Sequence, residues 1–360
     1  MKKGKIGTRS KEQGASDVVA NSVLDPCPLT LDPSNSYTPQ QGDFEFISDR
    51  DINVDLNFAS QGYWKGVAIH FIRNRFAMTG LILVGVIVLF AIFAPIVSSY
   101  SYQDIISVTD TNGKQIVAKS LSPQFAGDSQ GLFADKTFIF GTDDMGRDLW
   151  TRTWQGARIS LIIAFVAIFV DMLIGMSYGL FSGFFGGTVD NVMQRFIEII
   201  GSIPTLVIIS ILAIFMDKGI GLVIASLLIT EWIGMSKIAR AECLKLKERE
   251  YVLASRTLGA GSLHIIFKQI LPNTIGPVIT QVMFSIPVAI FTEAFLSFVG
   301  VGIVLPQCSI GSLIEAGFNN ITILPYQILP PILVLAILML GFNLIGDGFR
   351  EALSPKLEDM

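Results

Sequence analysis

The sequence predicts an all-α integral membrane protein with six transmembrane helices. Of its 360 residues, 51% are hydrophobic and 16% are charged, whereas soluble globular chains are about 25% charged. Several runs with at most one charge approach or exceed the ~20 apolar residues that a helix needs to cross the hydrocarbon core. They are longer than the roughly 10-residue strands of membrane β-barrels, and only helices and closed barrels satisfy their backbone groups in lipid.

Six apolar runs mark the expected spans. They lie at residues 77–99, 159–183, 196–216, 220–236, 275–303 and 328–346. The first and last runs carry no charge, and each of the others carries a single acidic residue. Pro204 interrupts the third run and Glu231 the fourth, so the apolar pattern is weakest there.

Lysine and arginine residues set the expected orientation, because they are enriched in short cytoplasmic loops. The segment 237–274 holds seven of them and the segment 304–327 holds none. These segments flank the fifth run, so we expect 237–274 and both chain termini in the cytoplasm. The loop 100–158 carries six basic residues on the expected outer side, but loops of about 60 residues follow the charge rule weakly.

The expected spans divide the chain into five regions. Residues 1–63 are rich in Ser, Asp, Asn and Pro after a basic cluster, which predicts a largely disordered cytoplasmic tail. The remaining regions are an amphipathic segment with the first transmembrane helix (64–99), a large extracytoplasmic loop (100–158), a core of five helices (159–349) and a cytoplasmic tail (350–360).

The loop 100–158 contains two local signals. Asn112-Gly113 predicts a tight hairpin turn. The segment GTDDMGRD at 141–148 groups three aspartates, but their spacing does not fit a calcium-binding EF-hand loop. We therefore expect a solvated loop that leads into an interfacial helix.

Motifs for enzymatic chemistry are missing from the sequence. There is no Gly-Lys-Ser/Thr of a phosphate-binding loop, which excludes ATP hydrolysis by that route. The net charge of −4 argues against nucleic-acid binding. The cysteines Cys27, Cys243 and Cys308 are far apart and indicate neither a disulfide framework nor a zinc site. We expect a chain without enzyme activity, and without a cofactor or metal of its own.

Acidic residues inside the expected spans are candidates for function. A charge in the hydrocarbon core is costly, so such a residue faces protein or water. The alternative is a polar contact between packed helices. Asp171 and Glu293 are the candidates for a translocation path, and both interpretations stay open for Glu293. Glu231 lies near the cytoplasmic end of its run, which favours a helix contact.

The segment YVLASRTLGAGSLHIIFKQILPN at 251–273 is the strongest candidate site. The stretch 237–258 favours a helix, and Gly259-Ala260-Gly261 ends it. Ser262 can cap a second short helix, which Pro272 would end before the fifth span. The pattern predicts a helix-turn-helix elbow.

The small residues at Ala254, Ser255 and Gly259 give this predicted elbow a face that another backbone can approach closely. Leu258, Leu263, Ile266 and Phe267 would add apolar side chains that project from the elbow. The alternative is a basic helix that lies on anionic lipid.

The elbow resembles the cytoplasmic coupling motif of ABC importer permeases, E-A-A-x3-G-x9-I-x-L-P. The matching or conservatively substituted positions are Ala254, Ser255, Gly259, Leu271 and Pro272. Leu253 stands in place of the Glu and Gln269 in place of the Ile. The motif is looser at both positions in the dipeptide and oligopeptide branch of the family.

Four further blocks are similar to that branch. They are FGTDDMGRDLWTRTWQGARISL (140–161), SGFFGGTVDNVMQR (182–195), TEAFLSFVGVG (292–302) and FNLIGDGFREALSPK (342–356). In CSIGSLI (308–314), Ile310 stands where the branch usually has Trp. The resemblance spans roughly residues 63–357. It says least about the structure of the outer opening of the translocation path, where CSIGSLI departs from the pattern.

The resemblance implies a type I ABC importer permease fold and the second permease of a pair in a bacterial cell membrane. The implied partners are a homologous permease, two cytoplasmic ABC ATPases that bind ATP and Mg, and an extracytoplasmic substrate-binding protein. The implied substrates are oligopeptides or dipeptides. The implied ATPase-coupling residues are Leu253, Ala254, Ser255, Arg256, Leu258, Gly259, Leu271 and Pro272.

Two alternatives to a peptide importer stay open at this point. Close relatives in the family carry nickel or other small solutes. A stand-alone ion-coupled secondary transporter would use an intramembrane carboxylate such as Glu293, but such folds usually show inverted repeats with matching broken helices. The sequence shows neither feature.

Overall fold

A computed structural model describes residues 63–353, apart from 111 and 126–130. The predicted tails therefore lie outside the described residues, except for Tyr63 and for 350–353. The helices are α1 (Tyr63–Arg73), α2 (Arg75–Val97), α3 (Leu149–Val170), α4 (Met176–Phe185), α5 (Gly187–Gly201), α6 (Thr205–Phe215), α7 (Ile220–Thr230), α8 (Trp232–Leu246), α9 (Glu250–Thr257), α10 (Ser262–Ile265), α11 (Leu271–Phe298), α12 (Ile310–Asn319) and α13 (Leu329–Ala352). Two π-helical turns, η2 (Asp171–Gly175) and η3 (Ile266–Ile270), and a 3-10 turn, η4 (Pro325–Gln327), join some of them.

Five helical runs among the described residues are long and apolar enough to cross a membrane. They are Arg75–Val97, Leu149–Phe185, Ile220–Leu246, Ser262–Phe298 and Pro325–Ala352. Helices α5 and α6 form a sixth span if the pair is counted as one, although it is bent by 78°. The predicted all-α membrane architecture is confirmed.

The bend between α5 and α6 follows from Pro204. Proline has no backbone N–H and disfavours a helical conformation in the residue before it. Pro204 itself has an extended ψ of 135° and precedes the first residue of α6. The apolar run 196–216 is thus two helices at a steep angle rather than one straight helix.

The fourth span is longer than the apolar run that predicted it. Its helices run from Ile220 to Leu246, with a break at Glu231 between α7 and α8. Arg240 lies within this helical run and pairs with Asp190 of α5 at 2.6 Å. Glu231 therefore lies near the middle of this span, not near its end as the sequence predicted.

Glycines allow the closest helix contacts. A Cβ atom at Gly175 would lie 2.6 Å from the Trp232 carbonyl oxygen, and one at Gly183 would lie 2.9 Å from the Arg240 carbonyl oxygen. On the other side of the bundle, a Cβ at Gly80 would lie 2.7 Å from the Gly341 carbonyl oxygen. Small residues at such spacings let the backbones of membrane helices pack directly together.

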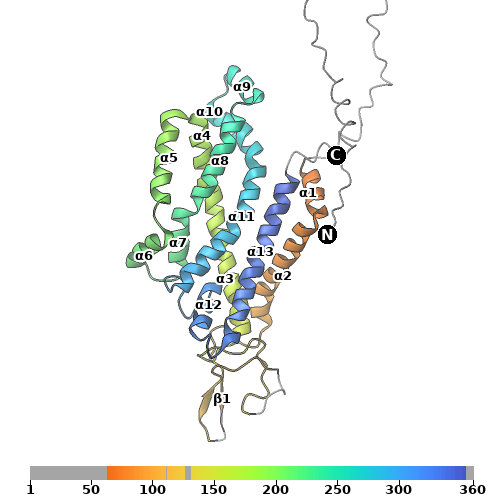
Figure 1. Ribbon diagram of the computed structural model, residues 1–360, viewed down its shortest axis with the longest axis vertical. Coiled ribbons are helices and arrows are strands. Elements are labelled where there is room, and N and C mark those ends of the chain that lie inside the picture. Colours follow the sequence, from red (N-terminus) through yellow and green to blue (C-terminus); the bar gives the residue numbers. More distant parts are fainter. Residues whose placement is uncertain (1–62, 111, 126–130, 354–360) are drawn as a thin grey trace, which may run out of the picture. The chain divides into compact units, whose positions relative to one another are not determined.

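The two ends of the described bundle differ in structure (Figure 1). One end, called here the loop end, carries strands β1 (Ser107–Thr109) and β2 (Gln115–Val117), which pair antiparallel. Gly113 has a φ of 75° in the turn between them, which confirms the predicted hairpin. The opposite end, the elbow end, carries α9.

The elbow differs from its predicted helix boundaries. The stretch 237–258 contains two helices, because α8 ends at Leu246 and α9 begins at Glu250. The prediction that Ser262 caps the next helix is wrong, since Gly261 is the N-cap and no side chain caps it. The prediction that Pro272 ends a short helix is also wrong.

Pro272 lies instead in the first turn of α11, where a missing N–H is tolerated. The helical path continues into α11 through η3, whose π-type bonding re-routes the hydrogen bonds before the proline. The second arm of the elbow is therefore the beginning of the fifth span.

Candidate functional site

The base of the elbow is anchored by apolar contacts. Val252 is fully buried in a cluster that includes Leu180 and Phe184 of α4 and Ile266 of η3. The Arg256 guanidinium lies 5.0 Å from the centre of the Phe184 ring, a cation–π contact. One face of α9 is thus held against α4, which fixes where the rest of the elbow points.

The turn after α9 is closed by backbone hydrogen bonds. The Leu258 N–H donates to the Ala254 carbonyl at 3.1 Å, and the Gly259 N–H donates to the Arg256 carbonyl at 3.0 Å. Gly259 has a φ of 83°, which favours glycine and confirms the predicted helix stop. The Gln269 side-chain amide donates to the Ser255 hydroxyl and ties the two arms together.

Apolar and small residues of the elbow remain exposed. Leu258 is 88% exposed, the largest such fraction among the exposed large hydrophobic residues in the described chain. Leu253, Ala254 and Pro272 are also exposed, whereas Leu271 and Ser255 are partly buried. A Cβ atom at Gly259 would meet nothing within 4 Å. The elbow thus presents an accessible surface with an apolar projection, of the kind that a partner buries.

An ion pair that the sequence analysis missed supports this end of the bundle. Two nitrogens of Arg240 on α8 each lie 2.6 Å from an oxygen of Asp190 on α5, and Ser182 also donates to Asp190. Such two-point pairs fix orientation as well as distance. No local spacing rule could find it, because the two residues are 50 positions apart.

Glu293 is enclosed within the chain. It is 0% exposed and accepts hydrogen bonds from the Ser160 hydroxyl at 2.5 Å and the Ser297 hydroxyl at 2.9 Å. The Ser160 oxygen also accepts from the Ile310 N–H at 3.3 Å. Glu293 therefore connects α3, α11 and α12, and this geometry favours the helix-contact interpretation over the path.

The other acids behave differently. Asp171, at the start of η2, is 2% exposed, and its carboxylate oxygens accept no hydrogen bond from the described part of the chain. Glu198 is exposed and pairs with Arg195 at 2.6 Å. Glu231 is partly buried and borders a cavity. The four acidic residues of the expected spans thus have four different environments.

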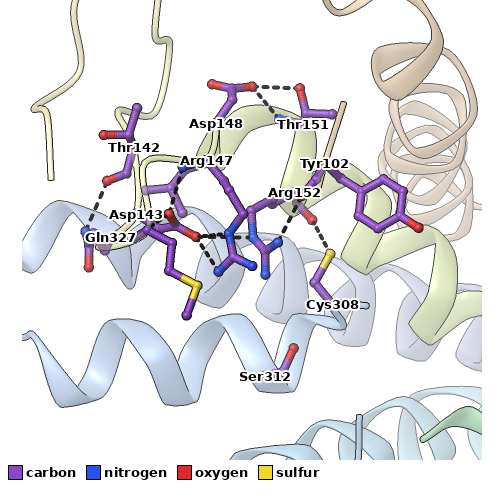
Figure 2. Close-up of polar contacts among 12 residues, drawn as sticks. Tyr102, Thr142, Asp143, Arg147, Asp148, Thr151, Arg152, Cys308, Ser312 and Gln327 are labelled. Carbon is purple, nitrogen blue, oxygen red and sulfur yellow. Dashed lines mark hydrogen bonds and ion pairs between the residues drawn. The ribbon is translucent and has the colours of Figure 1, made fainter. Parts of the chain in front are cut away.

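The aspartate-rich segment 141–148 is not the solvated loop that the sequence predicted. Asp143 is 6% exposed, and its Oδ2 atom lies 2.7 Å from Nε of Arg147 and 3.6 Å from Nε of Arg152. Its Oδ1 atom accepts from the backbone N–H groups of Met145 and Arg147. Figure 2 shows both guanidinium groups beside Asp143. The charges are buried because they pair with each other.

This cluster joins several parts of the loop end (Figure 2). Arg152 donates to the Tyr102 carbonyl at 2.9 Å, and the Cys308 thiol donates to the Arg152 carbonyl at 3.5 Å. Gln327 donates to the Thr142 carbonyl at 3.1 Å. The segment thus fixes the loop after α2 and the loop before α12 to the start of α3.

Asp148 begins α3. Its carboxylate accepts the Thr151 N–H at 2.9 Å and the Thr151 hydroxyl at 2.6 Å, as in a helix N-cap. Burial raises the pKa of Asp148 above its ordinary value, although the Thr151 hydrogen bonds lower it. The Thr151 hydrogen bonds thus offset part of the cost of burying the charged carboxylate.

The described residues form a multi-pass helical bundle with an exposed elbow at one end, and no group of side chains among them could hold a metal ion. Residues 175–359 match the family described as the binding-protein-dependent transport system inner membrane component. Residues 62–121 match the N-terminal transmembrane domain of oligopeptide transport permease C. The chain belongs to this family of ABC importer permeases, within its oligopeptide and dipeptide branch.

Individual relatives support the same placement along nearly the whole chain. The oligopeptide permease OppC of Bacillus subtilis is 39% identical over 90% of this chain and 98% of its own length. The dipeptide permease DppC of the same species is 39% identical over 79% of this chain and 83% of its own. The OppC protein of Escherichia coli K12 is 36% identical over 84% of this chain and 94% of its own length.

Among solved structures, an inward-facing MetNI methionine ABC transporter aligns with 56% of this chain and 96% of its own. That alignment has 18% identity and a TM-score of 0.48.

Proposed function

We propose that this chain forms one half of the translocation path of an ATP-driven importer of oligopeptides or dipeptides. A second, homologous permease supplies the other half. The support is that the relatives that match most of the chain are permeases of oligopeptide and dipeptide transport systems.

The elbow couples this permease to its ATPases. The single observation that carries this proposal is the exposed Leu258 beside the open Gly259 turn, on a base that is anchored by Val252. An exposed leucine gains about 1.5–3 kcal/mol when a partner buries it fully. The docking set is Leu253, Ala254, Ser255, Arg256, Leu258, Gly259, Leu271 and Pro272. Two cytoplasmic ABC ATPases bind this surface and hold the ATP and Mg.

The orientation follows from this docking. The elbow end and both termini lie in the cytoplasm of a bacterial cell, in agreement with the seven basic residues of 237–274. The loop end faces outward and receives substrate from an extracytoplasmic binding protein. A secondary transporter that uses Glu293 has little support, because that carboxylate is enclosed by Ser160 and Ser297.

The test is co-purification from detergent-solubilised membranes of cells that express the whole transporter. We expect Leu258→Asp to insert normally but to lose the ATPases and peptide uptake, because a charge would replace the apolar contact. Ile323→Asp is the matched control, since Ile323 is 79% exposed on a loop-end segment. Gly259→Asp is a less specific test, because the φ of 83° would strain the backbone of any residue with a side chain there.

A chain that recovers its ATPases and transports peptide despite Leu258→Asp would disprove docking through the elbow. Loss of ATPases from both variants would indicate general misfolding instead, and measuring the amount of inserted chain separates that case.

A further inference from the structure

A polar pocket lies at membrane depth, and neither the elbow nor the loop-end cluster explains it. The cavity has a volume of about 440 Å³ and opens between the α5–α6 bend, the break between α7 and α8, and α11. Its polar lining consists of Thr205, Thr230, Glu231, Lys237, Gln281 and Ser285. Charged side chains at this depth face water or protein rather than lipid.

The backbone around the pocket leads to the same conclusion. Residues 202–204 are non-helical and exposed at the α5–α6 bend, and Gly201 and Ile203 line the cavity. Non-helical backbone is not tolerated against lipid, which cannot satisfy its hydrogen bonds. The face that carries the pocket is therefore turned toward water or toward another protein chain.

The two charges of the pocket are free to meet a ligand. Among the described residues, neither Glu231 nor Lys237 forms a side-chain hydrogen bond or an ion pair. Lys237 lies six positions nearer the elbow along the helical run, which corresponds to about 9 Å of helix. The pocket thus offers separated charges of opposite sign.

A second acidic residue, Asp171, lies near Glu231 without lining the pocket. The two carboxylates interact electrostatically, and Ser285, which lines the pocket, also interacts with Asp171. The acidic side chains are thus on the side of the pocket away from the elbow, and Lys237 lies nearer the elbow.

We propose that this pocket is a charge-reading section of the peptide translocation path, in which Glu231 meets ammonium groups and Lys237 meets carboxylate groups of the passing peptide. The proposal rests on the function proposed above. It places Glu231 on the path instead of Glu293, because the Glu231 side chain reaches the cavity while Glu293 is enclosed.

The experiment measures uptake into proteoliposomes that contain the complete transporter and its binding protein. Two tripeptides of equal length are compared, one with a central lysine and one with a central glutamate. The readout is the ratio of their initial uptake rates. The amount of active complex and its ATPase rate cancel in this ratio, and the preference of the binding protein is the same for every variant.

Glu231→Gln should lower the lysine-to-glutamate ratio, and Lys237→Gln should raise it. Each change should be roughly fivefold, as expected for one ionic contact in a hydrated site. Glu231→Asp should keep the ratio of the original chain. The matched controls Asp347→Asn and Lys65→Gln remove the same charges from exposed positions outside the pocket, and should leave the ratio unchanged.

Opposite shifts in the two pocket variants would support the proposal. Unchanged ratios with active transport would overturn it, and so would an equal loss of both peptides from a well-inserted variant, which indicates a packing role. If the original complex takes up neither peptide, it is the proposed peptide transport that fails.

Discussion

The first arm and turn of the elbow (250–261) and the polar cluster around the start of α3 (142–152) lie at opposite ends of the described bundle and present opposite surfaces (Figure 1). In the elbow, apolar Leu258 is exposed, and a Cβ atom at its neighbour Gly259 would meet nothing within 4 Å. In the cluster, Asp143 and Arg152 are buried against each other. An exposed apolar side chain is available to a partner, whereas a buried, paired charge already has its partner in the same chain.

The largest effect that this comparison predicts is at Asp143. Replacing it with Ala leaves two buried guanidinium groups without their carboxylate, and removing one member of a buried pair costs about 3–5 kcal/mol. We expect Asp143→Ala to lower the unfolding temperature and the amount of purified complex. Asp144→Ala is the matched control, because the adjacent Asp144 is exposed. Equal unfolding temperatures for the two variants would show that the cluster does not stabilise the loop end.

Some features of the elbow and of the polar cluster could be predicted from the sequence, and others could not. The spans, the hairpin at Gly113 and the glycine stop at Gly259 depend on local composition and backbone preference, and the structure agrees. The burial of Asp143 was missed because the local pattern is that of a polar loop, in which the nearby Arg147 and Arg152 do not show whether they pair with Asp143 or face water. Charge density alone does not distinguish a solvated segment from an internally paired one.

The intramembrane acids show the same limit. Glu231 was set aside because the apolar run stops at 236, yet the helix continues to Leu246 and places Glu231 near mid-span. Glu293 was favoured by depth alone, yet two serine hydroxyls enclose it. The ends of a helical span and the face of a helix that meets a cavity both depend on packing, which the apolar pattern alone does not show.

An intermediate effect on stability should distinguish the buried face of α9 from its exposed face. Val252 is fully buried against α4, whereas its neighbour Leu253 is 47% exposed. Val252→Ala should cost about 2 kcal/mol of unfolding free energy through lost burial, while Leu253→Ala should change stability by less than about 0.5 kcal/mol. Thermal unfolding of the purified complex measures both. If α9 detaches as a unit from α4, the two variants will be equally mild, and the elbow is not anchored as described.

The smallest expected effect is a local one: a change in the chemical reactivity of the Cys308 thiol. Its thiol is buried and donates to the Arg152 carbonyl, and burial raises the pKa of this thiol above its ordinary value. Only the thiolate reacts with maleimide, so in a Cys27→Ser, Cys243→Ser background we expect labelling only after denaturation. Adding Asp143→Ala should make Cys308 reactive in the native complex, because the cluster that covers it loosens, whereas adding Leu258→Asp should not. Fast labelling in the background chain would show that Cys308 is in contact with water. That result would contradict the buried cluster at the loop end, and with it the comparison with the exposed elbow.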